Sequence, residues 1–227
     1  MKYQIMQPGS YAMIKVDLAA NEVMKAESGA MVAMHPNIDV EAKVDGGMFG
    51  ALKRAVLTGE SVFFQTLKAT RGPGEVYLAP GVPGDVTVME LNGANHFFLQ
   101  KQAFLAGDDG LTIEAVSQGF FKGLLSGEGM FIQKVSGKGT LAISSFGAIH
   151  KITLAPGQQY IVDNSHLVAW SGTVTYDVQK ASSGWFSSIG SGEGLVCKVN
   201  GPGDVWFQTR NPGAFGSWIR QFIPSKG

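Results

Sequence analysis

The chain has 227 residues and a formal net charge of zero, with 18 lysines and arginines against 18 aspartates and glutamates. Its 44% of hydrophobic residues is enough to build a folded core, which excludes wholesale disorder. The balanced charge provides no basic surface of the kind that binds nucleic acid, and the 31 glycines are about twice the usual share of roughly 7%.

Short strands dominate the elements that we predict along the chain. Apolar and polar residues alternate over Ile38–Val44, as in a strand with one buried face. The pattern of Phe49–Val56 fits two helical turns, and Val62–Phe64 is apolar throughout, as in a strand covered on both sides. Alternation returns over Val174–Val178, and the apolar residues of Trp218–Ile223 share one face of a helix. Many short strands separated by turn signals predict an all-β protein.

The N-terminal segment and the cysteine content bear on the cellular compartment. Residues Met1–Gly9 lack the apolar segment of a signal peptide, and no apolar run approaches the roughly 18 residues needed to cross a bilayer. Cys197 is the only cysteine, so no disulfide can form within the chain. These features predict a cytoplasmic protein.

Three stretches of the chain align with one another without a gap. The aligned stretches are Leu18–Val40, Leu91–Ile113 and Leu154–Tyr176. Each begins with leucine and has an alanine at the same place, and these alanines are Ala33, Ala106 and Ala169. A large apolar or aromatic residue also recurs six places after the leucine, as Met24, Phe97 and Tyr160. The common order of these matches predicts a triplicated segment.

A second set of matches lies further along each copy. It consists of Thr58–Phe64, Ser126–Ile132 and Ser191–Cys197. Each is followed by a glycine-rich turn and a strand, and glycine supplies the positive φ angles that tight hairpins need. We therefore divide a single domain of residues 1–213 into units of about residues 10–82, 83–147 and 148–213, followed by a tail of residues 214–227.

Each unit on its own has unprotected strand edges and a small core, which favours packing of the units against one another. No linker rich in proline and serine separates them. We therefore expect three antiparallel β-sandwich-like units packed around a pseudo-threefold axis in one compact body, with a short C-terminal helical tail.

The aromatic and glycine-rich loops, followed by Ser/Thr-Gly-Glu three times over, resemble the family named after the yeast altered-inheritance-of-mitochondria protein. The resemblance covers about residues 1–213. It implies an attenuator-like fold, similar to that of the tryptophan RNA-binding attenuator protein, with antiparallel β units around an axis. The yeast relative is linked to mitochondrial organisation, which implies a scaffold or membrane-associated role rather than catalysis. The chain shows no mitochondrial presequence, and the family provides no catalytic residues to transfer.

Sequence motifs of catalysis are absent, including the phosphate-binding loop, the dinucleotide glycine pattern and the serine nucleophile elbow. The histidines His35, His96, His150 and His166 stand at different places in the units and lack the spacing of metal ligands. Cys197 lies in an apolar stretch, which favours a buried thiol over a nucleophile. We therefore expect no catalytic residue, no metal and no cofactor, and we interpret the protein as not an enzyme.

A glutamate recurs at the start of a strand in each unit. The three glutamates are Glu60, Glu128 and Glu193. Each can cap a turn by accepting backbone N–H bonds, which is the interpretation we favour. The alternative is a cation site, because three converging carboxylates repel one another unless a cation lies between them.

A glycine-rich apolar loop precedes this glutamate in each unit. The large residues of the three loops are Phe49, Phe120, Phe121, Trp185 and Phe186. The loops either fold back over the ends of their own units or form an exposed apolar patch, which marks an association surface. We expect a second copy of the chain as the partner, and contact with a lipid surface is the alternative, which the scarcity of basic residues weakens.

The tail lies outside the triplication. Its apolar residues, Trp218 and Phe222 among them, predict a helix that docks on the body or on a partner subunit. The sequence thus predicts a non-enzymatic, self-associating scaffold or interaction protein that forms a homo-oligomer, with no nucleic-acid partner expected. The alternatives are a small-ligand or nucleic-acid binding module between the β units, and peripheral membrane association through the aromatic loops.

Overall fold

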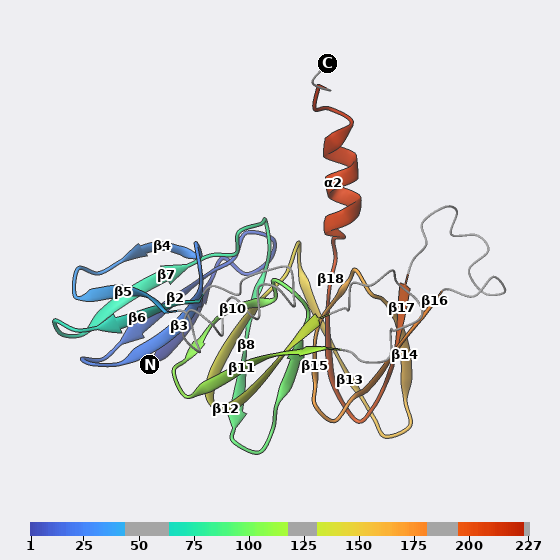
Figure 1. Ribbon diagram of the computed structural model, residues 1–227, viewed down its shortest axis with the longest axis horizontal. Coiled ribbons are helices and arrows are strands. Elements are labelled where there is room, and N and C mark those ends of the chain that lie inside the picture. The colour runs from blue at the N-terminus through green and yellow to red at the C-terminus, as the bar shows by residue number, and fades with distance from the viewer. Residues whose placement is uncertain (44–63, 118–130, 181–194, 225–227) are drawn as a thin grey trace.

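The computed structural model describes residues 1–43, 64–117, 131–180 and 195–224, and in these ranges the regular secondary structure of the compact chain is β-strand apart from one helix (Figure 1). The first seven strands are β1 (Lys2–Met6), β2 (Met13–Leu18), β3 (Val23–Glu27), β4 (Met31–Met34), β5 (Ile38–Lys43), β6 (Phe64–Ala69) and β7 (Gly74–Leu78). The next five are β8 (Val86–Asn92), β9 (Phe97–Leu99), β10 (Phe104–Asp108), β11 (Leu111–Ser117) and β12 (Phe131–Ser144). The last six are β13 (Ile149–Leu154), β14 (Gln159–Asp163), β15 (Leu167–Ser171), β16 (Thr175–Lys180), β17 (Leu195–Asn200) and β18 (Gly203–Gln208). The helix α2 (Pro212–Arg220) follows, so the predicted all-β body with a short C-terminal helix is confirmed.

Three sheets hold the described strands, and the pairs within them are antiparallel. One sheet has the order β1-β2-β7-β4, and the smallest has the order β14-β17-β16. The third follows the path β13-β18-β15-β9-β12-β10-β3-β6-β5, with β8 and β11 also paired to β12. The long strand β12 joins two parts of this sheet, because its first half pairs with β9 and β11 and its second half with β8 and β10.

Burial alternates along the strands because one face of each sheet turns toward the core. In β2, the side chains of Ile14, Val16 and Leu18 are buried, and the residues between them are half-buried. Buried apolar residues form three clusters, and each cluster takes residues from more than one region of the chain. The first joins Ile14 to Leu105, and the second contains Trp206. The clusters therefore tie successive parts of the chain into one body.

Residues that align in the sequence also occupy the same pairing positions. The opening leucines pair with glycines, namely Leu18 with Gly74, Leu91 with Gly139 and Leu154 with Gly203. Beside the recurring alanines, β4, β10 and β15 each carry a register shift against the neighbouring strand. These shifts lie between Met31 and Ala33, between Phe104 and Ala106, and between Leu167 and Ala169. The three pairs of strands therefore have the same register.

Strand pairing shows that the second set of sequence matches is misaligned by one residue in its third member, Ser191–Cys197. The aligned residues Met24, Phe97 and Tyr160 pair with Leu67, Val135 and Val199. In the same strands, Ala26, Leu99 and Val162 pair with Gln65, Gln133 and Cys197. Cys197 therefore stands level with Gln65 and Gln133, whereas the sequence matches put it level with Phe64 and Ile132.

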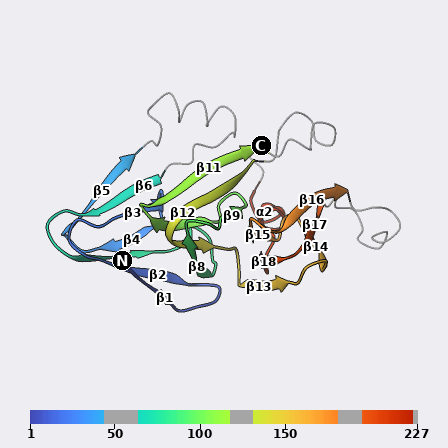
Figure 2. The same ribbon diagram turned by 90° about the horizontal axis from the view of Figure 1, so that it is seen from below.

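Strands β4 and β14 lie at opposite ends of the body, with β10 and β12 between them (Figures 1 and 2). Each is the last strand of its sheet. Among the described strands, the sheet hydrogen bonds therefore do not run in a closed circle. The expected packing around a pseudo-threefold axis gains no support from this arrangement.

Candidate interaction surfaces

The loops and glutamates singled out in the sequence lie outside the described residues. They comprise Phe49, Phe120, Phe121, Trp185 and Phe186 of the loops and the glutamates Glu60, Glu128 and Glu193. The predicted helix over residues 49–56 also lies outside them. Among the described residues, candidate surfaces are formed by the tail helix, by a pocket at its base and by the ends of the sheets.

Helix α2 begins two residues before the predicted boundary of the tail, at Pro212. Proline suits the first turn of a helix because its missing N–H would be unpaired there in any case. Asn211 caps the helix, since its side-chain oxygen accepts the backbone N–H of Ala214 at 3.0 Å. Arg220 lies in the last turn, where a positive charge is favourable. Local sequence signals thus account for the bounds of α2.

The large apolar residues of this segment form a tail patch, which consists of Phe215, Trp218, Phe222 and Ile223. The helix stands away from the strands (Figure 1), and none of its residues is buried. Trp218 is 55% exposed and Phe222 is 68% exposed, so neither side chain is buried against the body of its own chain, and docking on a partner subunit stays a prediction. Phe222 and Ile223 also lie beyond the end of the helix.

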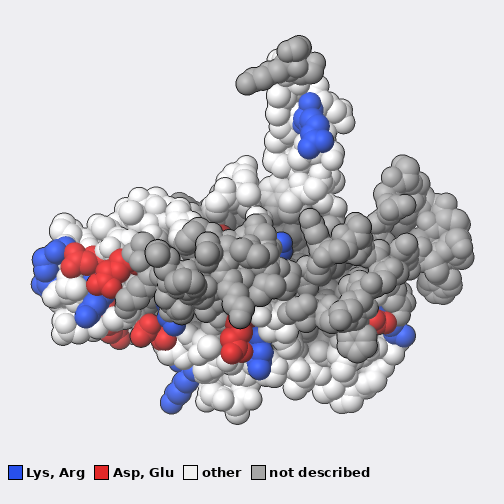
Figure 3. Space-filling model, viewed as in Figure 1, with Lys and Arg blue, Asp and Glu red and all other residues white. Residues whose placement is uncertain are grey.

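The rings of the tail patch contact one another more than they contact the body. The ring centroid of Trp218 lies 6.0 Å from that of Phe215 and 5.1 Å from that of Phe222. Phe215 also reaches the body, with its ring centroid 5.1 Å from that of Phe146. Arg220 is the charged residue of α2, and the rest of the described helix surface on the face shown in Figure 3 carries no charged side chain. The tail patch is therefore a continuous aromatic surface open to solvent.

A pocket of about 320 Å³ lies at the base of the helix. Phe215 and Gly216 line it from α2, and residues from several strands complete it, including Glu27 and Lys101. Burial raises the pKa of the Glu27 carboxyl to about 6. Its volume, apolar walls and few polar groups are features that small-ligand pockets share.

The edges of β4 and β14 are a surface that sequence reasoning missed. On β4, Met31, Val32 and Met34 are exposed. On β14, Tyr160 and Ile161 are exposed. The alignment of the three copies predicts these strands, and only the order of the described strands reveals that each is the last in its sheet.

Cys197 is buried, as its apolar setting predicts. Its Sγ lies 3.2 Å from Oδ1 of Asn164 and 3.5 Å from the phenol oxygen of Tyr176. Burial raises the pKa of this thiol to about 11, and the hydrogen bond with Tyr176 opposes the rise. The protonated thiol is a poor nucleophile at neutral pH.

The histidines stand apart from one another in separate local contacts. His166 Nδ1 lies 2.7 Å from the carbonyl oxygen of Gln208, and His35 Nδ1 accepts the backbone N–H of Asn37. Within the four described ranges, no three residues among histidine, cysteine, aspartate and glutamate are placed to hold a metal ion. In the same part of the chain, no helix has the length and apolar character needed to cross a membrane.

Comparison with known proteins finds similarity over most of the chain. The family described as mitochondrial biogenesis AIM24 matches residues 3–210. An uncharacterised protein of Streptococcus pyogenes serotype M6 is 33% identical, and the alignment covers 99% of this chain and 92% of that protein. The mitochondrial altered inheritance of mitochondria protein 24 of Verticillium alfalfae is 26% identical over 71% of this chain and 41% of its own length. The crystal structure of a Streptococcus pyogenes protein superposes with a TM-score of 0.80 at 32% identity, over 98% of this chain and 99% of the other.

Proposed function

The chain belongs to the mitochondrial biogenesis AIM24 family, and from this premise we propose that it is a non-enzymatic scaffold whose copies associate with one another. The tail patch is the observation that carries the proposal. Large contiguous apolar surfaces are rare on proteins that remain monomeric, and they mark sites of association. Burying a side chain such as Phe222 in a contact is worth about 1.5–3 kcal/mol. The rings of Phe215, Trp218 and Phe222 contact one another in series, and Ile223 is exposed next to Phe222 in the sequence.

The experiment is static light scattering of the purified full-length chain over a range of concentrations. We expect a mass above that of one chain, which falls on dilution. The double variant Trp218→Ser/Phe222→Ser should shift this dissociation to higher protein concentration, whereas Ser217→Ala in the same helix should leave it unchanged. A mass of one chain at every concentration would overturn the proposal.

We also infer that the body arose by triplication of one β unit. The registers of the described strands support this inference, because the opening leucine of each copy pairs with a glycine and the recurring alanine follows a register shift in each. In a row of repeated units, each unit contacts only its neighbours, so the first and last units each keep one unpaired edge. Triplication therefore explains why β4 and β14 are edge strands.

A second candidate function is the binding of a small ligand in the pocket at the base of α2. Its support is the juxtaposition of Glu27 and Lys101 with apolar walls in about 320 Å³. A panel of small carboxylates and amines in a thermal-shift assay tests it. A ligand that raises the melting temperature of the chain, and fails to do so after Lys101→Ala, would favour this function.

The proposal also covers the cellular location of the protein and the kinds of partner that it binds. We propose a cytoplasmic protein without a nucleic-acid partner, since lysines and arginines only balance the acidic residues. Contact with a membrane through the aromatic loops remains the alternative. Binding to vesicles that contain anionic lipid, lost at moderate salt, would favour that alternative.

A further inference from the structure

Two junctions inside the chain show how one β unit joins the next. At the first, β3 pairs with β10, and Lys25 stands opposite Gly107. At the second, β9 pairs with β15, and Phe98 stands opposite Trp170. Both pairs are antiparallel. Lys25 and Phe98 occupy the same place in their copies, and so do Gly107 and Trp170, so the two junctions have the same register.

Among the described strands, β4 and β14 correspond to junction strands but take part in neither junction. By the alignment, β4 is the counterpart of β10 and β15, and β14 is the counterpart of β3 and β9. Each is the terminal strand of its sheet, so among the described strands each has a neighbour on one side only. Each end of the body therefore presents one half of a further junction, β4 at one end and β14 at the other (Figures 1 and 2).

Side chains at aligned positions are buried in the two internal junctions and exposed on β4 and β14. Ala106 and Ala169 are fully buried, whereas their counterpart Ala33 on β4 is exposed. Phe97 on β9 is 8% exposed, whereas its counterpart Tyr160 on β14 is 46% exposed. Formation of the junction is thus what covers these positions elsewhere in the chain.

The two free edges also lack the features that keep strand edges apart. Proteins protect such edges with charged residues, especially lysine, or with proline. The four residues of β4 include neither, and β14 contains one charged residue, Asp163. Met34 is 37% exposed and Ile161 is 53% exposed, so each edge presents apolar side chains to solvent.

We propose that β14 of one copy pairs antiparallel with β4 of a second copy, in the register of the two internal junctions. This inference rests on the proposed self-association and adds a second contact surface to the tail patch. The register places Met34 opposite Ile161 and Ala33 opposite Val162. Since β4 and β14 lie at opposite ends of one chain, the pairing joins different copies. It merges the sheet β1-β2-β7-β4 with the sheet β14-β17-β16 of the neighbouring copy.

The contact is head-to-tail, because each copy contributes a different edge at each of its two ends. Head-to-tail contacts generate rings when the rotation between copies closes, and open filaments when it does not. The two internal junctions, β3 with β10 and β9 with β15, already join successive units of one chain by the same strand pairing. The assembly therefore continues, from copy to copy, the arrangement that links the units of a single chain.

Cysteine cross-linking of two singly substituted full-length proteins tests the register. Residues directly opposite in an antiparallel pair have Cα atoms about 4.5–5.5 Å apart, within the range of a disulfide. We expect an equal mixture of Met34→Cys and Ile161→Cys to form a disulfide-linked species of two chains under mild oxidation, while either variant alone forms none. The matched control mixes Met34→Cys with Tyr160→Cys, whose side chain points to the other face of β14, and it should remain unlinked.

The unsubstituted protein controls for the native Cys197, which is buried. Cross-linking of Met34→Cys with itself would indicate pairing of β4 with β4 and would overturn the proposal. A chain that carries both Met34→Cys and Ile161→Cys should likewise form no internal disulfide, and an internal disulfide would overturn the proposal. If light scattering shows association but the mixture does not cross-link, the edge pairing is overturned and the proposed scaffold function stands. A mass of one chain throughout would overturn both.

Discussion

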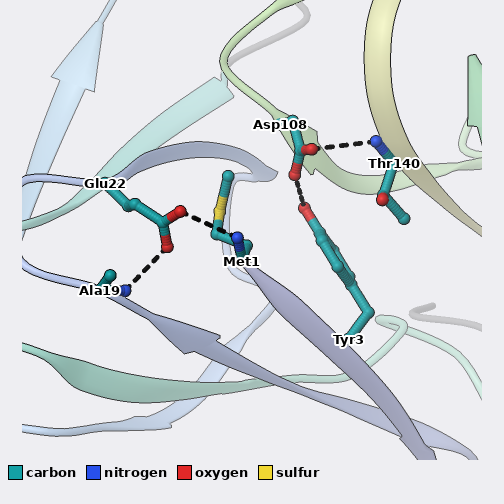
Figure 4. A network of polar contacts seen from close by, with 6 residues as sticks. All are labelled: Met1, Tyr3, Ala19, Glu22, Asp108 and Thr140. Atoms are coloured by element: carbon teal, nitrogen blue, oxygen red, sulfur yellow. Dashed lines mark hydrogen bonds and ion pairs between the residues drawn. The ribbon is translucent and has the colours of Figure 1, made fainter. Parts of the chain in front are cut away.

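The phenol of Tyr3 donates a hydrogen bond of 2.6 Å to Oδ1 of Asp108, which lies 105 residues further along the chain (Figure 4). Oδ2 of Asp108 accepts the backbone N–H of Thr140 at 3.0 Å. One carboxyl group thus joins β1, β10 and β12, which belong to two different sheets. Burial and the nearby Asp108 raise the pKa of Tyr3 well above its usual range, so the phenol keeps its proton.

Removal of this hydroxyl should weaken the contact between the two sheets. We expect Tyr3→Phe to lower the free energy of unfolding by about 1–2 kcal/mol, because the part-buried Asp108 loses a donor. Urea unfolding measures the change as a lower midpoint with an unchanged slope. Tyr11→Phe is the matched control, since Tyr11 is 79% exposed. Equal midpoints for the two variants would contradict the assigned role.

A second prediction concerns Gly84, where two backbone segments lie close together. A Cβ atom at this position would lie 1.7 Å from the backbone oxygen of Ser145. The carbonyl oxygen of Gly84 also accepts the N–H of Ala12, so the segment has little freedom to move away. We expect Gly84→Ala to destabilise the fold by about 3 kcal/mol or more. Gly81→Ala, where a Cβ meets nothing within 4 Å, should melt within a few degrees of the unsubstituted chain, and a similar loss in both would contradict the steric explanation.

Much of the strand architecture is predictable from the sequence because it depends on local signals. Alternation predicts β5 and β16, and two glycine turns predict β7 and β18. The turn predicted at Gly137–Gly139 is wrong, because β12 continues through it as one strand. The alignment also predicts that Leu18, Leu91 and Leu154 are equivalent, and their pairing with glycines agrees with it. These features arise within one hairpin, where period and turn chemistry decide the structure.

The features that the sequence did not predict depend on what lies beside a strand or helix in the folded chain. The alignment treats the three copies alike, whereas β4 and β14 differ from their counterparts because, among the described strands, each has a neighbour on one side only. The helical period of the tail reveals an apolar face but not what covers it, so the exposure of Trp218 is a finding of the structure. The short second block is too weak a pattern to exclude a shift by one residue, and pairing alone placed Cys197 level with Gln133.

The buried thiol of Cys197 provides a third prediction. Its pKa of about 11 leaves a thiolate fraction smaller by roughly a hundredfold or more than that of a free cysteine near 8.5. We expect a thiol-specific reagent at pH 8 to modify the folded chain more slowly than the urea-unfolded chain by at least this factor. Val82→Cys, at a position 49% exposed, supplies a fast-reacting control in the folded protein. Equal rates in the folded and unfolded chains would contradict the burial of this group.

The carboxyl of Glu27 makes stability depend on pH, with a sign that can be worked out. Burial raises its pKa from 4.5 to about 6, so between these values the folded chain binds more protons than the unfolded chain. The contribution of Glu27 to stability therefore falls as pH rises from about 4.5 to about 6, and it remains low above that range. We expect Glu27→Gln to melt at a higher temperature than the unsubstituted chain at pH 7.5.

The difference between the two proteins should vanish near pH 4, where Glu27 is protonated in both states. Glu75→Gln is the control of opposite sign, because Lys15 Nζ lies 2.6 Å from the Glu75 carboxylate and holds the pKa of that group below its usual range. This variant should melt lower than the unsubstituted chain at pH 7.5, and its deficit should shrink as the pH falls. Melting curves of the three proteins from pH 4 to 7.5 separate the two effects. A gap for Glu27→Gln that stays constant with pH would mean that the amide changes packing rather than removing a buried charge.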